Sequence, residues 1–230
     1  CVRGGPGELL KGVPGELEVP ANAVIVLEGY IETDELGTEG PFGDHTGYYT
    51  PPVPFPVFHL TAMTMRRDAI YPSIVVGKPP QEDAWLGKAT ERIFLPAVRA
   101  TVPEIVDYDL PVAGAFHNCC IVSIEKAYPG HAQKVMHAIW GLGMLRLTKC
   151  VVVVDAHVNV HDYEEVMFYA GANVDPARDV MIGEGPLDHL DHAPQRQFVG
   201  GKLGIDATSK LPEEGARPWP EEIEMSPEIR

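Results

Sequence analysis

Two carboxylates stand five residues apart in the segment 39–49, which reads EGPFGDHTGYY. Its glycines allow backbone angles that other residues resist, and Pro41 fixes one φ angle. The segment is therefore too rich in glycine and proline to continue as a helix or a strand. A pair of acids on a stiff loop suits proton transfer, because one carboxylate can stay ionised while burial or its neighbour raises the pKa of the other. Glu39 and Asp44 are accordingly our candidate catalytic residues.

The two acids also have a structural interpretation. Aspartate is common in turns, so Glu39 and Asp44 could be a cap and a turn residue. Aromatic residues interleave with the acids, which favours a site for a flat, apolar ligand over a solvated loop. His45 follows Asp44 directly and is a candidate for tuning its pKa or for lining the substrate pocket.

The composition is that of a globular protein without a nucleic-acid surface. The 230 residues are enough for one large domain or two small ones, and 45% of them are hydrophobic. The net charge is −15 and the basic residues are scattered, which leaves no basic patch to neutralise phosphates. We therefore expect no nucleic-acid partner.

Cysteine usage and hydropathy indicate a cytoplasmic protein. The four cysteines, at positions 1, 119, 120 and 150, show no C-x-x-C spacing and no secretory disulfide framework. No apolar run approaches the roughly 18 residues of a membrane helix, and no signal peptide is recognisable. Because the chain starts at Cys1 without a methionine, we expect a fragment or a processed chain.

The elements that must position the acid loop fall into two halves. Before residue 80, β-branched runs predict strands at 23–31, 57–65 and 69–76, as in an antiparallel sheet or barrel. Helical spacing predicts a helix over 81–102, with the division of the chain near residue 105. Beyond it, strands at 116–124, 150–154 and 180–182 alternate with helices at 132–147 and 163–172, the order of an α/β domain. The predicted organisation is a barrel-like domain with the acid loop over 1–80, a connecting helix over 81–105, an α/β oligomerisation domain over 106–200 and a polar tail over 201–230.

Stretches along nearly the whole chain resemble the UbiD family of decarboxylases. They are VPANAVIVLEGYI (19–31), EGPFGDHTGYY (39–49), FPVFHLTAMTMRRDAIYPS (55–73), VGKPPQEDAWLG (76–87), PEIVDYDLP (103–111), YPGHAQKVMHAIWG (128–141) and KLGIDATSK (202–210). The resemblance implies a partial split β-barrel of the flavin-reductase type, followed by a small α/β domain and joined to it by a long helix.

The resemblance also implies an activity. Family members catalyse reversible, non-oxidative decarboxylation of aromatic or unsaturated carboxylic acids with prenylated FMN, a divalent metal such as Mn²⁺ and often K⁺. The family's two catalytic acids match Glu39 and Asp44, with Asp44 as the proton donor and Glu39 relaying through an arginine. Leu86 matches a position that lines the substrate pocket. The HTGYY form of the loop resembles members acting on 4-hydroxybenzoate-type acids, including the polyprenylated precursor of ubiquinone.

Part of the family's active site is expected to lie outside this chain. The catalytic arginine, the Asn, His and Glu that bind the metal, and most flavin-phosphate contacts should precede Cys1. Asp206 matches a residue of the metal and potassium region and is a metal candidate. We therefore expect the C-terminal half of such an enzyme, forming a homo-oligomer and working with an N-terminal-half partner. The alternative is a catalytically incomplete assembly subunit, or half of a split enzyme without activity of its own.

Two histidine pairs and the start of one predicted helix are further candidates for metal or phosphate sites. His157 with His161, and His189 with His192, have the spacing of metal ligands, but a structural role is favoured for both pairs. There is no G-x-G-x-x-G after a strand and no Walker A loop. The predicted helix that opens at Gly130 is too poor in glycine to indicate a phosphate site.

Overall fold

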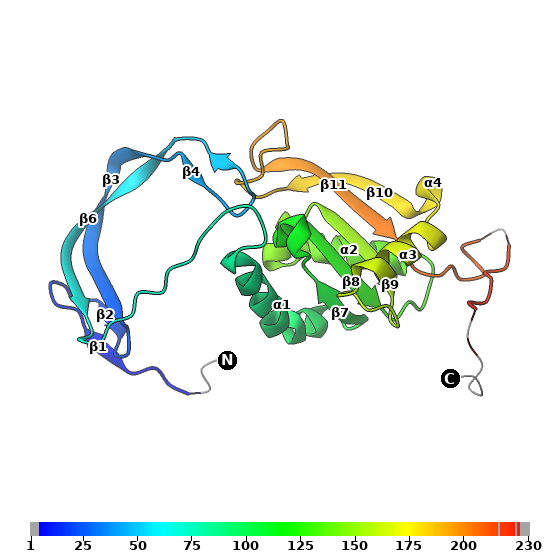
Figure 1. Cartoon of the computed structure of the whole chain (residues 1–230), viewed down its shortest axis with the longest axis horizontal. Coiled ribbons are helices and arrows are strands. Elements are labelled where there is room, and N and C mark those ends of the chain that lie inside the picture. The colour runs from blue at the N-terminus through cyan, green and yellow to red at the C-terminus, as the bar shows by residue number, and fades with distance from the viewer. Residues whose placement is uncertain (1–4, 216, 224, 226–230) are drawn as a thin grey trace. The chain divides into compact units, whose positions relative to one another are not determined.

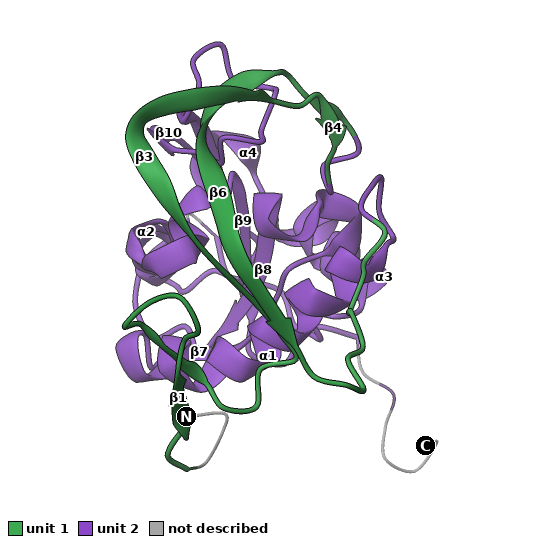
Figure 2. Ribbon diagram, turned by 90° about the vertical axis from the view of Figure 1, so that its left-hand side faces the viewer, with its two compact units in different colours: residues 1–44, 48–75 green, residues 45–47, 76–230 purple. Residues whose placement is uncertain are grey.

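The computed structural model describes residues 5–215, 217–223 and 225, which form two compact units (Figure 2). Unit 1 comprises the residues up to Asp44 together with Tyr48–Val75, and unit 2 comprises His45–Gly47 and the residues from Val76 onward. The division therefore lies at residue 75 rather than near 105. The reason is that the predicted connecting helix packs against a strand of unit 2 and belongs to that unit.

Unit 1 consists of antiparallel strand pairs. β1 pairs with β2, β3 with β6, and β4 with β5. The long β3–β6 ribbon runs from the Ile25–Met65 pair to the Glu39–Val53 pair, and its register shifts between Glu28 and Gly29. The strands are β1 Leu9–Lys11, β2 Glu18–Pro20, β3 Ile25–Glu39, β4 Phe42–Gly43, β5 Tyr49–Thr50 and β6 Val53–Met65.

The sequence predicted two of these strands and misplaced a third. The runs 23–31 and 57–65 lie in β3 and β6, as expected. The run 69–76 contains no strand, so that prediction is wrong. Its β-branched residues have no neighbouring strand to pair with, and Pro72 lacks an N–H for a ladder. Among the described residues of unit 1, the strands form two-stranded sheets and no closed barrel.

Unit 2 is built on a five-stranded sheet in the order β10-β11-β9-β8-β7 (Figure 1). The three inner strands β8, β9 and β11 are parallel, and the two outer strands are antiparallel to their neighbours. The apolar run 150–154 is the central β9, as predicted for a buried parallel strand. Residues 201–206, expected in a tail, form most of β11, because their backbone pairs with both β9 and β10. The bounds are β7 Ile105–Asp109, β8 Cys119–Ile124, β9 Cys150–Asp155, β10 Val180–Pro186 and β11 Val199–Asp206.

Helices cover both faces of this sheet. α1 (Glu82–Thr101) and α2 (His131–Gly141) pack on one face, over Val122 and Val153, which are fully buried. α3 (Tyr163–Asn173) packs on the other face, around Val154. The short helix α4 (Pro176–Asp179) precedes β10, and 3₁₀ turns occupy η1 Val112–Gly114, η2 Phe116–Asn118 and η3 Gly143–Leu147.

Local sequence accounts for the helix ends. The Asp162 side chain accepts hydrogen bonds from the backbone N–H groups of Glu164 and Glu165 at 3.1 and 3.2 Å, which caps the start of α3. The predicted helix 132–147 ends as α-helix at Gly141, and η3 follows it. No helix in the described ranges is both long enough and apolar enough for a membrane span.

Candidate active site

The acid segment 39–49 forms a small hairpin at the end of the long ribbon. β3 ends at Glu39, and β4 and β5 then pair Phe42 with Thr50. The backbone N–H of Asp44 donates to the carbonyl of Tyr48 at 3.1 Å, which closes the turn. Gly40 and Gly47 have φ angles of +91° and +84°, in the left-handed region that favours glycine. The hairpin fixes the backbone of Asp44, as expected for a residue that must present one carboxylate in one place.

The two candidate acids differ in their surroundings. Glu39 is exposed at the end of β3, whereas Asp44 is only 8% exposed. The two carboxylates therefore differ in their access to solvent.

His45 and His117 form a pair that the sequence did not predict. Their Nε2 atoms lie 2.7 Å apart, although 72 residues separate them. The His45 ring stacks on Phe116, with ring centroids 4.9 Å apart. Burial lowers the pKa of His117, against the opposing effect of the Asp188 carboxylate 3.8 Å away. A neutral pair can share one N–H···N hydrogen bond, in which one ring donates and the other accepts.

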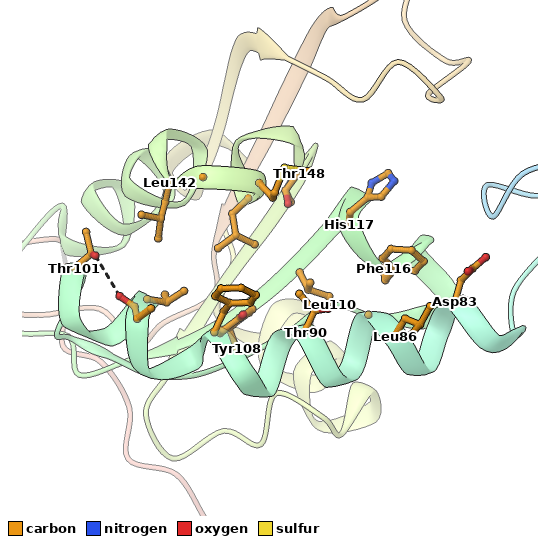
Figure 3. Close-up of a pocket in the computed structure, with 17 residues that line it drawn as sticks. Asp83, Leu86, Thr90, Thr101, Tyr108, Leu110, Phe116, His117, Leu142 and Thr148 are labelled. Carbon is orange, nitrogen blue, oxygen red and sulfur yellow. Dashed lines mark hydrogen bonds between the residues drawn. The ribbon is translucent and has the colours of Figure 1, made fainter. Parts of the chain in front are cut away.

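An apolar cavity of about 690 Å³ lies in unit 2 between α1 and η3 (Figure 3). Leu86, Thr90, Phe94, Ala97 and Thr101 line it from α1, at spacings that place them on one helix face. At one end the close-up shows His117 and Phe116 near Asp83 and Leu86, and at the other Thr101 and Leu142. The other lining residues are Gly87, Val98, Tyr108, Leu110, Gly143, Met144, Leu145 and Thr148.

Three polar atoms in the cavity wall have no hydrogen-bond partner among the described residues. They are Asp83 Oδ2, His117 Nδ1 and Thr148 Oγ1. Thr148 is only 1% exposed, so its hydroxyl cannot be satisfied by bulk water. Buried polar groups are normally paired, and mostly apolar walls with a few unpaired polar atoms are typical of a small-molecule site.

The predicted site residues are thus partly brought together. Leu86 lines the cavity, and His45 contacts Phe116 and His117 of its wall. Asp44 directly precedes His45 in the chain, so the acid hairpin continues into this cluster. His117 was missed because a single histidine in a strand-like run carries no spacing signal; its role depends on a contact 72 residues distant.

A second cluster, at Glu91, Asp109 and His161, has the donor atoms of a metal site. However, Lys88 is already ion-paired with Glu91 and Asp109, and Tyr163 OH donates to Asp109 at 3.0 Å. The chain thus satisfies these carboxylates itself. The donor set does not fit a resident metal ion, because an ammonium group stands where a cation would bind. His157 contacts Tyr169 instead and does not converge with His161.

Asp206 is likewise held by protein contacts. Its carboxylate accepts from the Thr208 hydroxyl at 2.5 Å and lies 3.2 Å from Lys210 Nζ. The group is 1% exposed. These contacts tie the segment after β11 to the sheet, and a structural role accounts for them. The metal role suggested for Asp206 stays a prediction.

The start of α2 is closed to a phosphate. Glu214 Oε1 accepts from the Gly130 backbone N–H at 3.4 Å, and Lys126 lies 2.6 Å from Glu214. Lys126 and backbone N–H groups also hold the pKa of Glu214 below its usual range, against the effect of burial, so the carboxylate is ionised. A helix N-terminus attracts anions, and here the anion is a side chain of the same chain.

Two family models match the chain, one to each unit. The Rift-related domain of 3-octaprenyl-4-hydroxybenzoate carboxy-lyase (UbiD) matches residues 1–79, and the C-terminal domain of the same family matches residues 84–207. The boundary between the two matches lies close to residue 75, where the structure divides, and most of α1 falls within the match to the C-terminal domain.

Similar proteins agree with these matches. An uncharacterized protein of Archaeoglobus fulgidus is 62% identical over 94% of this chain and 45% of its own length. The UbiD-class enzyme HmfF of Pelotomaculum thermopropionicum, solved with FMN, has a TM-score of 0.76 at 36% identity, over 96% of this chain and 48% of that chain. A dimeric form of HmfF, solved with prFMN, has a TM-score of 0.73 at 34% identity, over 96% and 46%. Vanillic acid decarboxylase of Sedimentibacter hydroxybenzoicus has a TM-score of 0.82 at 28% identity, over 94% and 46%.

The chain spans about half the length of the relatives it matches. The family models for both units and the similar solved structures lead to one assignment. The chain belongs to the UbiD family of decarboxylases and covers about half of such an enzyme.

Proposed function

We propose that this chain contributes the proton-transfer half of a UbiD-type active site, for reversible, non-oxidative decarboxylation of an aromatic or unsaturated carboxylic acid. The observation that carries the proposal is the acid hairpin. It buries Asp44 and continues directly into His45, whose ring packs on the wall of an apolar cavity. A buried acid that directly precedes a residue of the cavity wall in sequence is suited to proton transfer to a substrate carbon.

Asp44 is the proposed proton donor. Its side chain is almost fully buried, and the hairpin holds its backbone through the Tyr48 carbonyl. Exposed Glu39 is the proposed partner, which returns the proton through the arginine expected from outside this chain. The two proposed roles follow the difference in burial between the two acids.

The cavity is the proposed site for the apolar body of the substrate. Leu86 and Phe116 supply flat or branched apolar contact, as an aryl or alkenyl group requires. The unpaired Thr148 hydroxyl and Asp83 carboxylate oxygen are available to polar substituents. A hydroxybenzoate-type acid has both parts, and it is the substrate class that we propose.

The histidine pair is proposed to position the donor. Burial lowers the pKa of His117, which favours the neutral ring that can accept from or donate to His45, the residue after Asp44. The stacking of His45 on Phe116 then fixes the residue that follows Asp44. Substitution of His117 should therefore shift the pH profile of the reaction and not only its rate.

The cofactor proposed for this site is prenylated FMN, which when bound supplies an electron sink for the carbon that loses carbon dioxide. The apolar cavity walls fit a flat ring system. The start of α2 is filled by Glu214 and does not fit the flavin phosphate. We therefore propose that the phosphate, a divalent metal such as Mn²⁺, and K⁺ are held chiefly by residues outside this chain.

Unit 1 is proposed to be part of a split barrel that other chain segments complete. Its β3–β6 ribbon leaves Tyr30, Phe58 and Leu60 about half exposed. A two-stranded ribbon is marginal in water unless its apolar face is covered. The proposed covers are an N-terminal half of the enzyme and further copies of this chain in a homo-oligomer.

The alternative is that this chain alone is an assembly subunit, or half of a split enzyme without independent activity. Flavin absorbance and carbon dioxide release from hydroxybenzoate-type acids decide between the two. We expect neither from the chain alone, and both after addition of the N-terminal half of a close relative. Turnover by the chain alone would contradict the proposal that its active site is incomplete.

The role of Asp44 is tested in the reconstituted enzyme. Asp44→Asn keeps the shape of the side chain but removes the transferable proton, so turnover should fall by about 10² to 10⁴-fold, the usual contribution of a general acid. Asp34→Asn, at an exposed position of β3, is the matched control and should leave turnover unchanged. Full activity of the Asp44→Asn enzyme would show that Asp44 is not the proton donor.

A further inference from the structure

Cys119 and Cys150 are direct neighbours in the sheet of unit 2. They begin the parallel strands β8 and β9 and are register partners in that ladder. Paired residues of parallel strands point to the same face of the sheet, and adjacent strands lie about 4.8 Å apart. This spacing falls within the roughly 4.4–6.8 Å between Cα atoms that a disulfide spans.

The third described cysteine has a different position. Cys120 is completely buried among the residues that α1 and α2 cover. The alternation of a strand sends Cys119 to the opposite face, and both Cys119 and Cys150 are partly exposed. Two of the three described thiols are therefore adjacent and accessible, and the third is neither.

The contact between the two thiols makes them chemically unequal. The Cys119 S–H directed at Cys150 holds the pKa of Cys150 below its ordinary value, against the effect of burial. The same contact, together with burial, raises the pKa of Cys119. Because the thiolate is the nucleophile, we expect the Cys150 sulfur to react first and the Cys119 sulfur to follow.

We propose that Cys119 and Cys150 form a peroxide-responsive dithiol site that closes to a reversible disulfide between β8 and β9. In the first step, the Cys150 sulfur attacks one oxygen of hydrogen peroxide; an S–O bond forms, the O–O bond breaks, and the other oxygen leaves as water. In the second step, the Cys119 sulfur attacks the Cys150 sulfur, the S–S bond forms, the S–O bond breaks, and the Cys119 proton leaves in a second water. Two thiols are oxidised by two electrons, one peroxide is reduced to two waters, and a dithiol reductant restores the thiols.

The position of Cys119 connects the dithiol site to the wall of the cavity. Cys119 directly follows η2, which carries Phe116 and His117 in the cavity wall. A bridge at Cys119 would fix the end of that turn to β9. The chemistry of the dithiol does not depend on the decarboxylase proposal, so either can fail alone.

Mass spectrometry of the whole chain tests the site. The protein carries Cys1→Ser, so that only the three described thiols react. After treatment with one equivalent of hydrogen peroxide, we expect the loss of two hydrogens, a peptide linking residues 119 and 150, and loss of alkylation at both; dithiothreitol should reverse all three. Cys120→Ser is the matched control and should give the same bridge.

Single variants separate the two roles. In Cys119→Ser, Cys150 should stop at the sulfenic acid and be labelled by dimedone, whereas in Cys150→Ser, Cys119 should remain unlabelled. Circular dichroism verifies that each variant is folded. If a variant does not fold, the time course of oxidation in the Cys1→Ser protein still tests the proposal, because it needs no further substitution. The proposal is overturned if that folded protein forms no bridge, if the bridge includes Cys120, or if Cys119 forms the sulfenic acid first.

Discussion

Unit 1 and unit 2 use apolar residues in opposite ways. In the β3–β6 ribbon of unit 1, Leu27 is 56% exposed and Ile31 54%, while in unit 2 Val122 and Ile139 are fully buried. The ribbon has two strands and two open faces, whereas the sheet of unit 2 has five strands with helices on both faces. The comparison predicts that unit 2 can fold by itself, and that unit 1 needs further contacts to be stable.

The largest expected effect comes from separating the two units. Residues 76–215, expressed alone, should give dispersed amide resonances and one cooperative unfolding transition, because they keep both buried core clusters. Residues 5–75, expressed alone, should give neither. If residues 5–75 alone were folded and monomeric, the two units would not differ in their ability to fold independently.

The next effect compares one isoleucine from each unit. Ile139→Ala removes a fully buried side chain of α2, and the free energy of unfolding should fall by about 2–5 kcal/mol. Ile31→Ala, at an exposed position of β3, is the control and should change it by less than about 1 kcal/mol. Denaturant titration of the whole chain measures both. Equal losses would show that the ribbon is covered in solution by an association of the chain.

A smaller effect is expected at a close backbone approach within unit 1. A Cβ atom at Gly29 would lie 2.1 Å from the His59 carbonyl oxygen, so Gly29→Ala must displace the backbone where the register shifts. We expect a loss of about 1–3 kcal/mol, as for other overpacked sites. Gly183→Ala in β10 has open space around it and is the matched control. Amide hydrogen exchange should become faster in β3 and β6. Unchanged exchange rates there would show that the ribbon accommodates the added methyl group without losing stability.

The smallest effect concerns pH. Burial lowers the pKa of His117, so the unfolded chain binds this proton more readily than the folded one, and unit 2 should lose stability as the pH falls below the usual histidine range. NMR titration of the imidazole resonances should place the pKa of His117 below the ordinary histidine value. Asp188→Asn should lower the His117 value further, because the Asp188 carboxylate raises it. A His117 pKa at or above the ordinary histidine value would show that its ring is open to solvent.

Sequence reasoning succeeded where local pattern and tertiary environment agree. The apolar run 150–154 predicted a buried parallel strand, and β9 has buried residues on both faces of the sheet. It failed where pairing decides the structure. β11 contains three glycines and was assigned to a tail, yet its backbone lies between β9 and β10. The run 69–76 has strand-forming residues and no partner strand, so it stays irregular.

The same division holds for the candidate site. Glycine and proline around Glu39 and Asp44 predicted a structured acid loop, because those residues restrict the backbone locally. Leu86 was identified by resemblance, and the structure places it in a cavity wall. The contact of His45 with His117 could not be predicted, because it joins residues 72 positions apart and follows from the packing of unit 2.

The position of β11 has a consequence for how the protein is made. β11 is the last of the five strands to leave the ribosome, but it occupies the gap between β9 and β10. Until residues 199–206 have emerged, β9 exposes an open hydrogen-bonding edge and β10 has no neighbour. A nascent chain that pauses in the preceding segment would therefore be a substrate for chaperones, and slow translation there would favour aggregation over assembly.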